Sequence, residues 1–487
     1  MKKLDELLLN IPHEILQGSS DVCVTSIEND SRKVKDGSLF FCIRGAVTDG
    51  HKYAPDVAEK GASVIVAEEA VPVPETVTVV KVPDSRRAMA LIACAWFDHP
   101  SRKLKMVGVT GTKGKTTTTY MIRSILEGAG LKTGLIGTIE TIIGDEVIPS
   151  EHTTPESVTV QSYLAKMADA GIEVCVMEVS SQALMLDRTA GIEFDLGIFT
   201  NIEPDHIGPA EHESFEDYLE CKSRLFRQCR TGILNFDDSH LEKILEGHTC
   251  EVETFGFGEG ADLQAYNEHL FVGKGYLGVS YSLKGLLNMD VTVDIPGRFS
   301  VYNSMCAAAV CRHFGIGKDR ITAALKQAKV KGRIELVKVS DEFTLMIDYA
   351  HNAMALESLL TTLKEYKPNR LVCLFGCGGN RSKLRRFEMG EVSGRLADLT
   401  IITSDNPRNE DPEAIMDDIV TGISKTDGKY VRISDRKDAI RYAIRNGQPG
   451  DIVVLAGKGH EDYQEIKGKK YPMDERVLIS EILAEKP

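Results

Sequence analysis

The sequence predicts an α/β protein of three domains, with parallel sheets in the second and third domains. A chain of 487 residues exceeds the size of one hydrophobic core, and domains of roughly 100–200 residues suggest about three of them. From residue 106 onward, apolar strand-like runs alternate with helical patterns, which indicates parallel sheets covered by helices. Two polar connectors lie at residues 98–105 and 329–335. We therefore expect domains at residues 1–100, 101–331 and 332–487.

The composition is that of a soluble globular protein, with 42% hydrophobic and 27% charged residues. The net charge of −14 argues against nucleic acid or an anionic membrane as the main partner, because both bind basic surfaces. The sequence contains no apolar run long enough to cross a bilayer, which takes about 18 residues. We expect small-molecule substrates, and neither a nucleic-acid nor a membrane partner.

The number and positions of the cysteines indicate in which cellular compartment the protein works. Their number, eleven, is odd, and no C-x-x-C pair occurs. Most lie in apolar segments, as Cys175, Cys306 and Cys373 do. This usage predicts buried, reduced thiols in the cytoplasm.

The first hundred residues predict a small domain with short strands. Two β-like runs, "SLFFCI" (38–43) and "ASVIVAE" (62–68), are separated by turns rich in glycine and aspartate. The N-terminal residues 1–16 predict an amphipathic helix and not a signal peptide. Acidic residues interrupt their apolar stretch, and no small-residue cleavage site follows.

The second domain opens with a phosphate-binding pattern at residues 106–130. A short apolar run leads into a Gly-rich turn, and a helix then begins that carries Met121 and Ile125 on one face. In such a strand–loop–helix unit, the backbone N–H groups of residues 111–115 can face phosphate oxygens. The strict P-loop pattern requires a glycine at position 109, where this chain has valine.

Two later strands supply candidate ligands for such a site. The apolar run of residues 171–182 reaches Glu178 near its carboxyl end, the edge at which ligands of parallel sheets collect. His206 follows the next strand in a polar loop. A solvated strand-end glutamate and a surface histidine are the alternatives for these two residues.

Residues 215–226 predict a helix with one apolar stripe, and Lys222 lies on that stripe. Burial can lower the pKa of an unpaired ammonium by roughly 3–5 units. Either Lys222 reaches water along the helix surface, or it lies in an active centre, where chemical modification would remove its charge.

The third domain repeats one geometry, in which strand-like runs end in polar clusters. These clusters should meet at one edge of a parallel sheet. Arg381 and Arg408 suit a carboxylate, because a guanidinium can bind it through two parallel hydrogen bonds. Glu461 suits an ammonium group, so together these residues predict a site for a zwitterion. The motifs are "DYAH" (348–351), "GCGGNR" (376–381), "SDNPR" (404–408) and "AGKGHE" (456–461).

Taken in order, these motifs resemble the Mur ligase family, and most closely its branch that adds the third amino acid of the peptidoglycan stem peptide. The resemblance covers nearly the whole chain. It includes "DSRKVKDGSLFFCIRGAVTDGH" (30–51), "GTKGKTT" (111–117), "TTP" (153–155), "EVSS" (178–181), "PDH" (204–206), "CKSRLF" (221–226), "YNS" (302–304), "GRIE" (332–335), "SDNPRNEDP" (404–412) and "AGKGHEDYQ" (456–464).

The resemblance implies a UDP-substrate domain, a central P-loop ATPase-type domain and a C-terminal Rossmann-like domain. It implies that ATP phosphorylates a carboxylate of a UDP-sugar peptide, and that an amine then attacks the acyl phosphate. The implied catalytic residues are Lys115, Glu178, His206 and Lys222. The implied Mg²⁺ ligands are Thr116, Glu178, His206 and Lys222, with Lys222 carbamylated by CO₂. The implied ATP-binding residues are Gly111, Thr112, Lys113, Gly114, Lys115, Thr116, Thr117, Asn303, Arg333 and Asp348.

For the substrates, the resemblance implies UDP-N-acetylmuramoyl-L-Ala-D-Glu and meso-diaminopimelate, bound by a cytoplasmic monomer. "DNPR" is typical of members that add diaminopimelate, since Arg408 can bind its distal carboxylate, which lysine lacks. The implied UDP-dipeptide residues are Ser31, Ala46, Val47, Thr48, Thr153, Thr154, Ser180 and Arg188. The implied amino-acid residues are Arg381, Asp405, Asn406, Arg408, Gly457 and Glu461.

The sequence departs from the family pattern at four places, three of them near the expected reaction site. They leave open a relative that acts on another acceptor or adds another amino acid such as L-lysine. A plain P-loop kinase or NTPase explains only the phosphate loop and leaves the third domain without a task. The departures are His152, Gln182, the loop 205–215, and residues 352–354.

Overall fold

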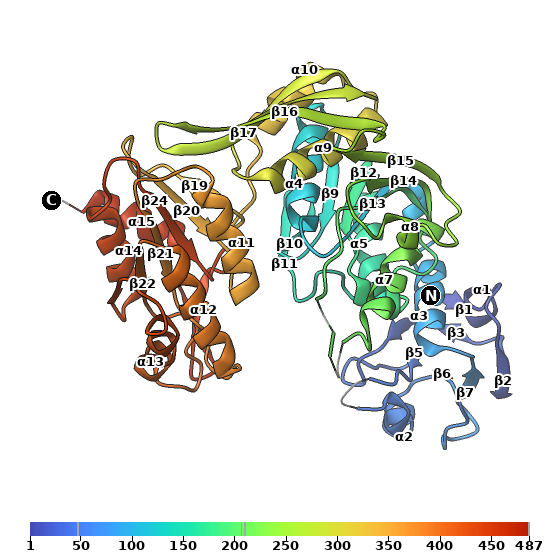
Figure 1. Ribbon diagram of the computed structural model, residues 1–487. Coiled ribbons are helices and arrows are strands. Elements are labelled where there is room, and N and C mark those ends of the chain that lie inside the picture. The colour runs from blue at the N-terminus through green and yellow to red at the C-terminus, as the bar shows by residue number, and fades with distance from the viewer. Residues whose placement is uncertain (46–47, 206, 209–210, 486–487) are drawn as a thin grey trace. The chain divides into compact units, whose positions relative to one another are not determined.

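The computed structural model describes residues 1–45, 48–205, 207–208 and 211–485. The chain forms two compact units (Figure 1). The first unit contains Met1–Asp262 and Ala309–Phe314, and the second contains Leu263–Ala308 and Gly315–Pro487. Each unit has an α/β architecture, as the alternating pattern predicts.

The N-terminal part of the first unit is a small five-stranded sheet of strand order β2-β7-β6-β5-β4. Strands β4 to β7 are parallel, and β2 joins the edge antiparallel. The two predicted runs form β5 and β6, whose residues are all buried. The bounds are β2 Glu14–Gln17, β4 Ser26–Glu28, β5 Ser38–Phe41, β6 Val64–Ala67, β7 Thr78–Lys81, η1 Gly50–Tyr53, α2 Ala54–Glu59 and α3 Ser85–Trp96.

The predicted N-terminal helix is wrong over most of its length. Only α1 (Leu4–Leu7) is helical, between β1 (Lys2–Lys3), which pairs with β3 (Cys23–Val24), and a turn in which Asn10 has a φ of +64°. A longer helix cannot pass Asn10, whose backbone is in the left-handed region, and Pro12 disfavours its resumption because proline lacks an amide donor and disfavours helical geometry in the residue before it. Leu4, Leu7, Leu8 and Ile11 are buried in the core of the small sheet, whereas Leu9 is exposed.

A larger sheet in the first unit has the strand order β11-β10-β9-β12-β8-β13-β14-β15. Strands β9 to β15 along this order are parallel, and β10 and β11 form an antiparallel hairpin. The carboxyl ends of β8, β12 and β13 are therefore neighbours, and the polar segments that follow them meet at one edge. The bounds are β8 Lys105–Thr110, β9 Thr133–Ile136, β10 Glu140–Ile143, β11 Glu146–Pro149, β12 Val174–Glu178, β13 Phe194–Phe199, β14 Cys229–Asn235 and β15 Glu251–Gly256.

The helices of this region match the predicted ones. Helix α4 buries Met121 and Ile125 on one face, and the chain turns away after it at Gly130, where φ is +93°. Helix α7, extended by the 3-10 turn η3, buries the apolar stripe of residues 215–226 together with Lys222. The bounds are η2 Pro100–Lys103, α4 Lys115–Gly128, α5 Ser157–Asp169, α6 Ser181–Met185, α7 Phe215–Ser223, η3 Arg224–Arg227 and α8 Leu241–Ile244.

The second unit contains an antiparallel ribbon and a six-stranded sheet. The ribbon consists of β16, β17 and β18, and the sheet has the order β19-β20-β24-β21-β22-β23. Except for the antiparallel edge strand β19, the sheet is parallel. The ribbon and its helices are β16 Leu263–Gly273, β17 Tyr276–Gly285, β18 Met289–Val293, α9 Arg298–Arg312 and α10 Lys318–Gln327.

Alternate residues of the parallel strands enter two separate cores. In β24, Val454 and Ala456 pack with α11, α12 and α13, whereas Val453 and Leu455 pack with α14 and α15. Helices thus cover both faces, which confirms a Rossmann-like architecture. The bounds are β19 Glu335–Val337, β20 Thr344–Asp348, β21 Leu371–Phe375, β22 Leu399–Ile402, β23 Tyr430–Arg432, β24 Ile452–Ala456, α11 Ala353–Lys364, α12 Lys383–Leu396, α13 Pro412–Ile423, α14 Arg436–Arg445 and α15 Glu475–Ala484. A small hairpin follows β24 and consists of β25 Tyr463–Ile466 and β26 Lys469–Pro472.

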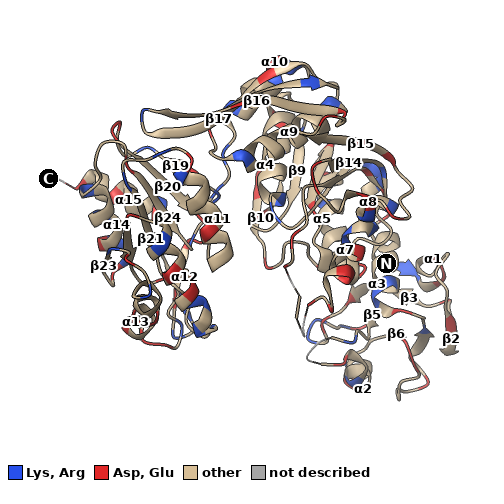
Figure 2. Cartoon of the chain, in the orientation of Figure 1, with Lys and Arg blue, Asp and Glu red and all other residues tan. Residues whose placement is uncertain are grey.

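Charged residues of both signs occur in both units, and the cysteines are free thiols, as the sequence predicts. Figure 2 shows basic and acidic residues interspersed over the helices of each unit. All eleven cysteines are free thiols, and ten of them are buried. No described helix combines the length and the apolar character needed to span a membrane.

Candidate active site

The phosphate loop lies between β8 and α4, where the sequence predicts it. Gly111 has a φ of +144° and Gly114 a φ of +86°, a backbone geometry that favours glycine. A Cβ atom on Gly111 would also lie 1.9 Å from the Thr200 hydroxyl oxygen. The Lys115 ammonium donates to the carbonyl oxygens of Gly111 and Thr112, at 2.8 and 3.1 Å. Lys115 thus caps its own loop, at the mouth where a phosphate group would lie.

Two amides of this loop do not face the phosphate position, contrary to the prediction for residues 111–115. The Thr112 N–H donates to the carbonyl oxygen of Asn201 at 2.8 Å, and the Lys113 N–H donates to its side-chain oxygen at 2.9 Å. Asn201 follows β13, which pairs with β8. Because Asn201 binds the first part of the loop, it fixes the loop shape, and the candidate phosphate donors lie nearer the start of α4.

Glu178 ends β12 and is fully buried. One carboxylate oxygen accepts from the hydroxyls of Thr116 and Thr138, at 3.0 and 2.9 Å, and the other accepts from the Thr138 amide at 2.9 Å. A Cβ atom on Gly137 would lie 2.6 Å from this carboxylate, so glycine leaves room for it. The arrangement excludes the alternative of a solvated strand-end glutamate.

Lys222 is 1% exposed, which excludes the alternative that it reaches water along the helix. Its ammonium nitrogen donates to the Gly111 carbonyl oxygen at 2.9 Å and lies 4.4 Å from the centre of the Tyr218 ring. Burial lowers the pKa of Lys222 well below its ordinary value, and the positive charge of Lys115 lowers it further, against a smaller opposing effect of Asp205. The surroundings of Lys222 therefore make the neutral amine more accessible than it is in water.

A cavity of about 280 Å³ connects these groups. It brings together six of the predicted residues: Lys115, Thr153, Thr154, Ser180, Arg188 and Lys222. Two of the residues that depart from the family pattern, His152 and Gln182, also line it. Glu211 and His212 of the departing loop 205–215 line it as well, and the remaining lining residues are Glu151, Ser181 and Tyr218.

One wall of the cavity is ordered by Thr154. Its hydroxyl donates to the Glu178 carbonyl oxygen at 2.8 Å and accepts from the Ser180 amide at 3.1 Å. The Arg188 guanidinium donates to the Thr154 carbonyl oxygen at 2.8 Å and also binds the Glu156 carboxylate. A buried arginine that enters this wall presents positive charge to the cavity, and such charge suits an anionic substrate.

Sequence reasoning missed a serine, a histidine and an aspartate that lie together in another wall. The two ring nitrogens of His212 lie 2.9 Å from an Asp217 carboxylate oxygen and 2.9 Å from the Ser181 hydroxyl oxygen. His212 is 1% exposed. Ser181 is distant in the sequence, so no local pattern reveals the group. The only signal is the histidine in the loop 205–215, five residues before a helix-start aspartate.

Several predicted residues of the first unit lie elsewhere or outside the described residues. His206, Ala46 and Val47 are outside them. Ser31 lies in a turn, where its carbonyl oxygen accepts from Lys60 at 2.9 Å. The Thr48 hydroxyl lies 3.3 Å from the Tyr53 hydroxyl. Neither Ser31 nor Thr48 lines the cavity described above.

The remaining nucleotide candidates lie in the second unit. Asn303 is buried in α9. Asp348 ends β20 and accepts from the amides of Ile334 and Ala350, both at 2.8 Å. Burial raises the pKa of Asp348, although the nearby Arg333 opposes the shift. Arg333 stacks 4.9 Å above the Tyr349 ring, and its Nε atom has no hydrogen-bond partner among the described residues.

The polar clusters of the third domain meet at the carboxyl edge of the parallel sheet, as predicted. A Cβ atom on Gly378 would lie 3.3 Å from an Arg408 nitrogen and 3.9 Å from the Arg381 side chain. At Gly457, where φ is +105°, a Cβ atom would lie 3.1 Å from an Asp405 carboxylate oxygen. Glycine thus lets the loops approach one another.

A buried lysine that sequence analysis did not identify, Lys458, lies at this edge and binds Asn406 and Glu461. Lys458 is fully buried and donates to the Asn406 side-chain oxygen and to the Glu461 carboxylate, both at 2.9 Å. The Asn406 amide nitrogen donates to the same Glu461 carboxylate at 2.9 Å. Glu461 is therefore not an isolated charge, and an ammonium ligand would join an existing ion pair.

Arg408 is held in a fixed orientation. Its Nε atom donates to the Glu465 carboxylate at 3.0 Å, and one terminal nitrogen donates to the Gly379 carbonyl oxygen at 2.7 Å. Its backbone has a φ of +51°, which is uncommon for a residue other than glycine or asparagine. The other terminal nitrogen has no hydrogen bond to a described residue and is the atom that can bind a carboxylate.

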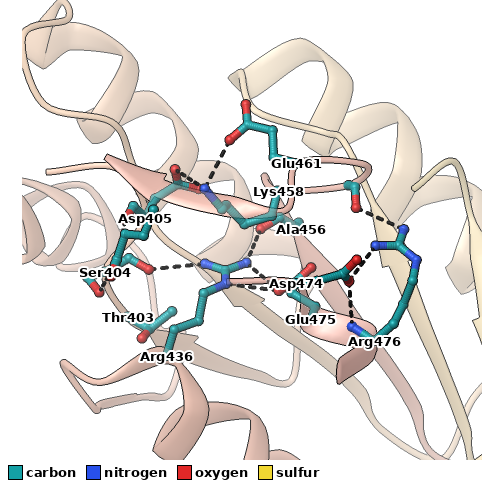
Figure 3. A network of polar contacts seen from close by, with 12 residues as sticks. Thr403, Ser404, Asp405, Arg436, Ala456, Lys458, Glu461, Asp474, Glu475 and Arg476 are labelled. Carbon is teal, nitrogen blue, oxygen red and sulfur yellow. Dashed lines mark hydrogen bonds and ion pairs between the residues drawn. The ribbon is translucent and has the colours of Figure 1, made fainter. Parts of the chain in front are cut away.

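A buried ion pair supports two of these loops from below (Figure 3). Arg436 of α14 and Glu475 of α15 are 3% and 0% exposed and lie 2.8 Å apart. The Arg436 guanidinium also donates to the carbonyl oxygens of Ser404 and Ala456, at 3.1 and 3.0 Å. These carbonyls begin the "SDNPR" and "AGKGHE" segments, so one side chain sets the position of both loops.

Comparison with known families finds three matches in order along the chain. Residues 24–97 match "Mur ligase family, catalytic domain", residues 109–311 match "Mur ligase middle domain", and residues 332–459 match "Mur ligase, glutamate ligase domain". Among curated proteins, UDP-N-acetylmuramoyl-L-alanyl-D-glutamate--2,6-diaminopimelate ligase 1 of Clostridium acetobutylicum is 42% identical over 99% of both chains. The ligase of the same name from Bacillus velezensis is 41% identical over 99% of this chain.

Solved structures agree with the sequence matches. A UDP-N-acetylmuramoyl-L-alanyl-D-glutamate--2,6-diaminopimelate ligase covers 99% of both chains with a TM-score of 0.73 and 28% identity. A MurF ligase from Thermotoga maritima in complex with ADP covers 94% of this chain with a TM-score of 0.56 and 19% identity. The second likeness concerns the fold.

Proposed function

This chain belongs to the Mur ligase family, and on that premise we propose that it adds meso-diaminopimelate to UDP-N-acetylmuramoyl-L-alanyl-D-glutamate. The activity is an ATP-dependent amide ligation in the synthesis of peptidoglycan precursors. Relatives that are 38–42% identical to the chain carry this activity in their names. ATP phosphorylates a carboxylate of the UDP-sugar peptide, the amine attacks the acyl phosphate, and ADP and phosphate are released.

The observation that carries the proposal is the single cavity that contains Lys115, the acceptor-binding candidates and Lys222. A phosphoryl group that enters the loop would take Lys115 from its contacts with the Gly111 and Thr112 carbonyls. Its charge then stabilises the transferring phosphoryl group. The acceptor carboxylate would lie against the cavity wall that contains Thr154, Ser180 and Arg188.

The residues present suit Mg²⁺. The Thr116 hydroxyl and the Glu178 carboxylate lie 3.0 Å apart, and both are the hard oxygen ligands that Mg²⁺ prefers. A bound Mg²⁺ would neutralise charge on the phosphate oxygens. Thr116 and Glu178 would hold the ion, and His206 is a further candidate for this role. The hydroxyl and amide of Thr138 keep the Glu178 carboxylate oriented.

The environment of Lys222 suits carbamylation, because CO₂ reacts with a neutral amine. The lowered pKa of Lys222 follows first from burial and then from the charge of Lys115. The carbamate would convert an unfavourable buried cation into a carboxylate beside the phosphate loop. Its negative charge would also pair with Lys115.

For the amine substrate, the free terminal nitrogen of Arg408 and the exposed Arg381 offer contacts for carboxylates. Asn406, Gly457 and Glu461 offer contacts for the ammonium end. We further propose that the protein works in the cytoplasm as a monomer. A relative that uses another acceptor remains the second candidate, because His152 and Gln182 line the cavity in which the acceptor would bind.

The proposal predicts that phosphate release from ATP requires both UDP-N-acetylmuramoyl-L-Ala-D-Glu and meso-diaminopimelate. The measurement is phosphate release over a panel of UDP-muramoyl acceptors and amino acids, with product mass as the check. Omission of either substrate should leave only background hydrolysis. Equal turnover with L-lysine would refute the amino-acid assignment, and turnover with another acceptor alone would favour the second candidate.

Replacement of Arg408 should change the choice of amine. A charge-assisted hydrogen bond contributes roughly 1.5–3 kcal/mol, so Arg408→Leu should lower kcat/KM for meso-diaminopimelate about ten- to over a hundredfold. Turnover of L-lysine, which lacks the distal carboxylate, should change little. Arg432→Gln removes an exposed guanidinium from the same sheet and is the matched control. An equal loss for both amino acids would mean that Arg408 only supports the loop.

A further inference from the structure

The Ser181, His212 and Asp217 side chains form a chain of hydrogen bonds in the cavity wall, and the residue roles proposed above leave this chain without a function. The His212 ring forms a hydrogen bond through Nδ1 to the Asp217 carboxylate and another through Nε2 to the Ser181 hydroxyl, each at 2.9 Å. Ser181 and His212 are 4% and 1% exposed. Both line the cavity that contains Lys115 and Thr154.

The contacts fix the direction of the hydrogen bonds. An ionised carboxylate only accepts, so Asp217 keeps the proton of His212 on Nδ1 and leaves Nε2 as an acceptor. Burial raises the pKa of Asp217, but the hydrogen bond from His212 opposes this effect, and the net shift of the pKa is downward. Nε2 therefore accepts the Ser181 hydroxyl proton, and the lone pairs of the Ser181 oxygen remain available to an N–H group in the cavity.

The orientation of His212 is further constrained by its surroundings. The Tyr218 ring lies 5.1 Å from the imidazole, centre to centre, at an interplanar angle of 59°. Asp217 lies in the first turn of α7, and its amide donates to the Ser214 hydroxyl at 3.2 Å. The imidazole therefore lies between a carboxylate, an aromatic ring and a hydroxyl, the surroundings expected of an oriented general base.

We infer that Ser181 and His212, held by Asp217, take up the proton that the incoming amine loses when it attacks the acyl phosphate. This inference rests on the proposed ligase function and assigns residues to its second half-reaction. A general base typically contributes about a hundred- to ten-thousandfold in rate. The base is needed because the attacking nitrogen becomes positively charged in the tetrahedral adduct.

The step balances in atoms and charge. The free amine donates its electron pair to the acyl carbon, and a C–N bond forms. The nitrogen then passes one proton to the Ser181 oxygen while Ser181 passes its own proton to Nε2 of His212. The carbonyl π pair, which moves onto oxygen when the C–N bond forms, re-forms the C=O bond as the C–O bond to phosphate breaks, and phosphate leaves with the electron pair of that bond. The imidazolium later returns its proton to solvent, which regenerates the base.

Other titratable and charged groups lie around His212 or line the same cavity. Asp217, Tyr218 and Cys221 on α7 lie beside it, and the cavity is also lined by Glu151, His152, Glu211, Lys115, Arg188 and Lys222.

The test separates the two half-reactions of the full-length enzyme. Exchange of bridging and non-bridging oxygens in ATP, measured with the UDP-dipeptide and without amine, reports acyl-phosphate formation. Amide formation is measured with meso-diaminopimelate. His212→Gln and Asp217→Asn should each lower amide formation at least about a hundredfold and leave the oxygen exchange within about threefold of wild type.

Two further readouts distinguish a base from a structural role. The acidic limb of the pH profile of amide formation should disappear in His212→Gln. Hydroxylamine, which attacks acyl phosphates without general-base help, should give the hydroxamate at the wild-type rate. Glu213→Gln changes an exposed neighbour in the same loop and is the matched control, with both half-reactions expected to be unchanged.

The outcomes are distinct. Wild-type amide formation by His212→Gln would overturn the inference, and so would loss of oxygen exchange together with ligation. An acyl group trapped on Ser181 would replace the base with a nucleophile and overturn it as well. A wild-type enzyme that forms no amide with any amine would refute the proposed function itself, whatever the variants do.

Discussion

Replacement of Lys222 by alanine should lower ligase activity by about a hundred- to a thousandfold, the range found when one group that stabilises a transition state is removed. The variant loses the amine that would carry the carbamate. It also removes one donor from the Gly111 carbonyl. Activity should return in part when acetate or formate is added, because a small carboxylate can occupy the vacated space.

Two controls separate the carbamate from the positive charge. Lys222→Arg keeps a cation but cannot take up CO₂ in the same way, so it should be as inactive as Lys222→Ala. Lys243→Ala removes an exposed lysine elsewhere in the same unit and should be fully active. Isotopically labelled CO₂ should give a carbamate signal in wild type that Lys222→Ala lacks. Near wild-type activity of Lys222→Ala would disprove the carbamate hypothesis.

Replacement of Arg436 by alanine should cost about 3–5 kcal/mol in the free energy of unfolding, the range for breaking a buried ion pair on one side. The change leaves the Glu475 carboxylate buried without its partner. It also leaves the Ser404 and Ala456 carbonyls without a donor. Denaturant unfolding of the second unit measures the loss, and KM for the amino acid should rise because two loops lose their support.

The neighbouring pair Lys437–Glu481 joins the same two helices but is exposed, at 34% and 51%. Lys437→Ala should therefore cost only about 0–1 kcal/mol. An Arg436→Met, Glu475→Leu double variant should recover most of the stability, since apolar pairs of similar volume can replace buried ion pairs. A loss below about 1 kcal/mol for Arg436→Ala would contradict the role assigned to this pair.

The sequence predicts the position of a site residue where that position follows from the direction of parallel strands alone. Parallel strands place their carboxyl ends at one edge, so the phosphate loop, Glu178 and the third-domain clusters could be located from alternating apolar runs. Lys222 could be singled out because a lysine on an apolar stripe is costly. Each inference needed only a local pattern and one general rule about sheets or burial.

What the sequence did not reveal depends on contacts between distant segments. Ser181 and His212 are 31 positions apart, and no periodicity connects them. Asn201 accepts hydrogen bonds from the amides of Thr112 and Lys113, which the loop sequence predicts to face phosphate. The pairing of Lys458 with Glu461 needs a particular loop path, because Lys458 could equally have pointed to solvent. The predicted N-terminal helix is wrong because the amphipathic pattern does not reveal the left-handed turn at Asn10.

The Gly111 carbonyl oxygen accepts from both Lys115 and Lys222, and this shared acceptor has a thermodynamic consequence. Under the proposed carbamylation, a nucleotide that draws Lys115 away would change the charge felt by Lys222, and hence its tendency to take up CO₂. Linkage requires the reverse effect to be of equal size, so CO₂ pressure should alter nucleotide affinity by the same factor. Nucleotide occupancy and the modification state of the enzyme are then coupled variables, which must be controlled together in any binding measurement.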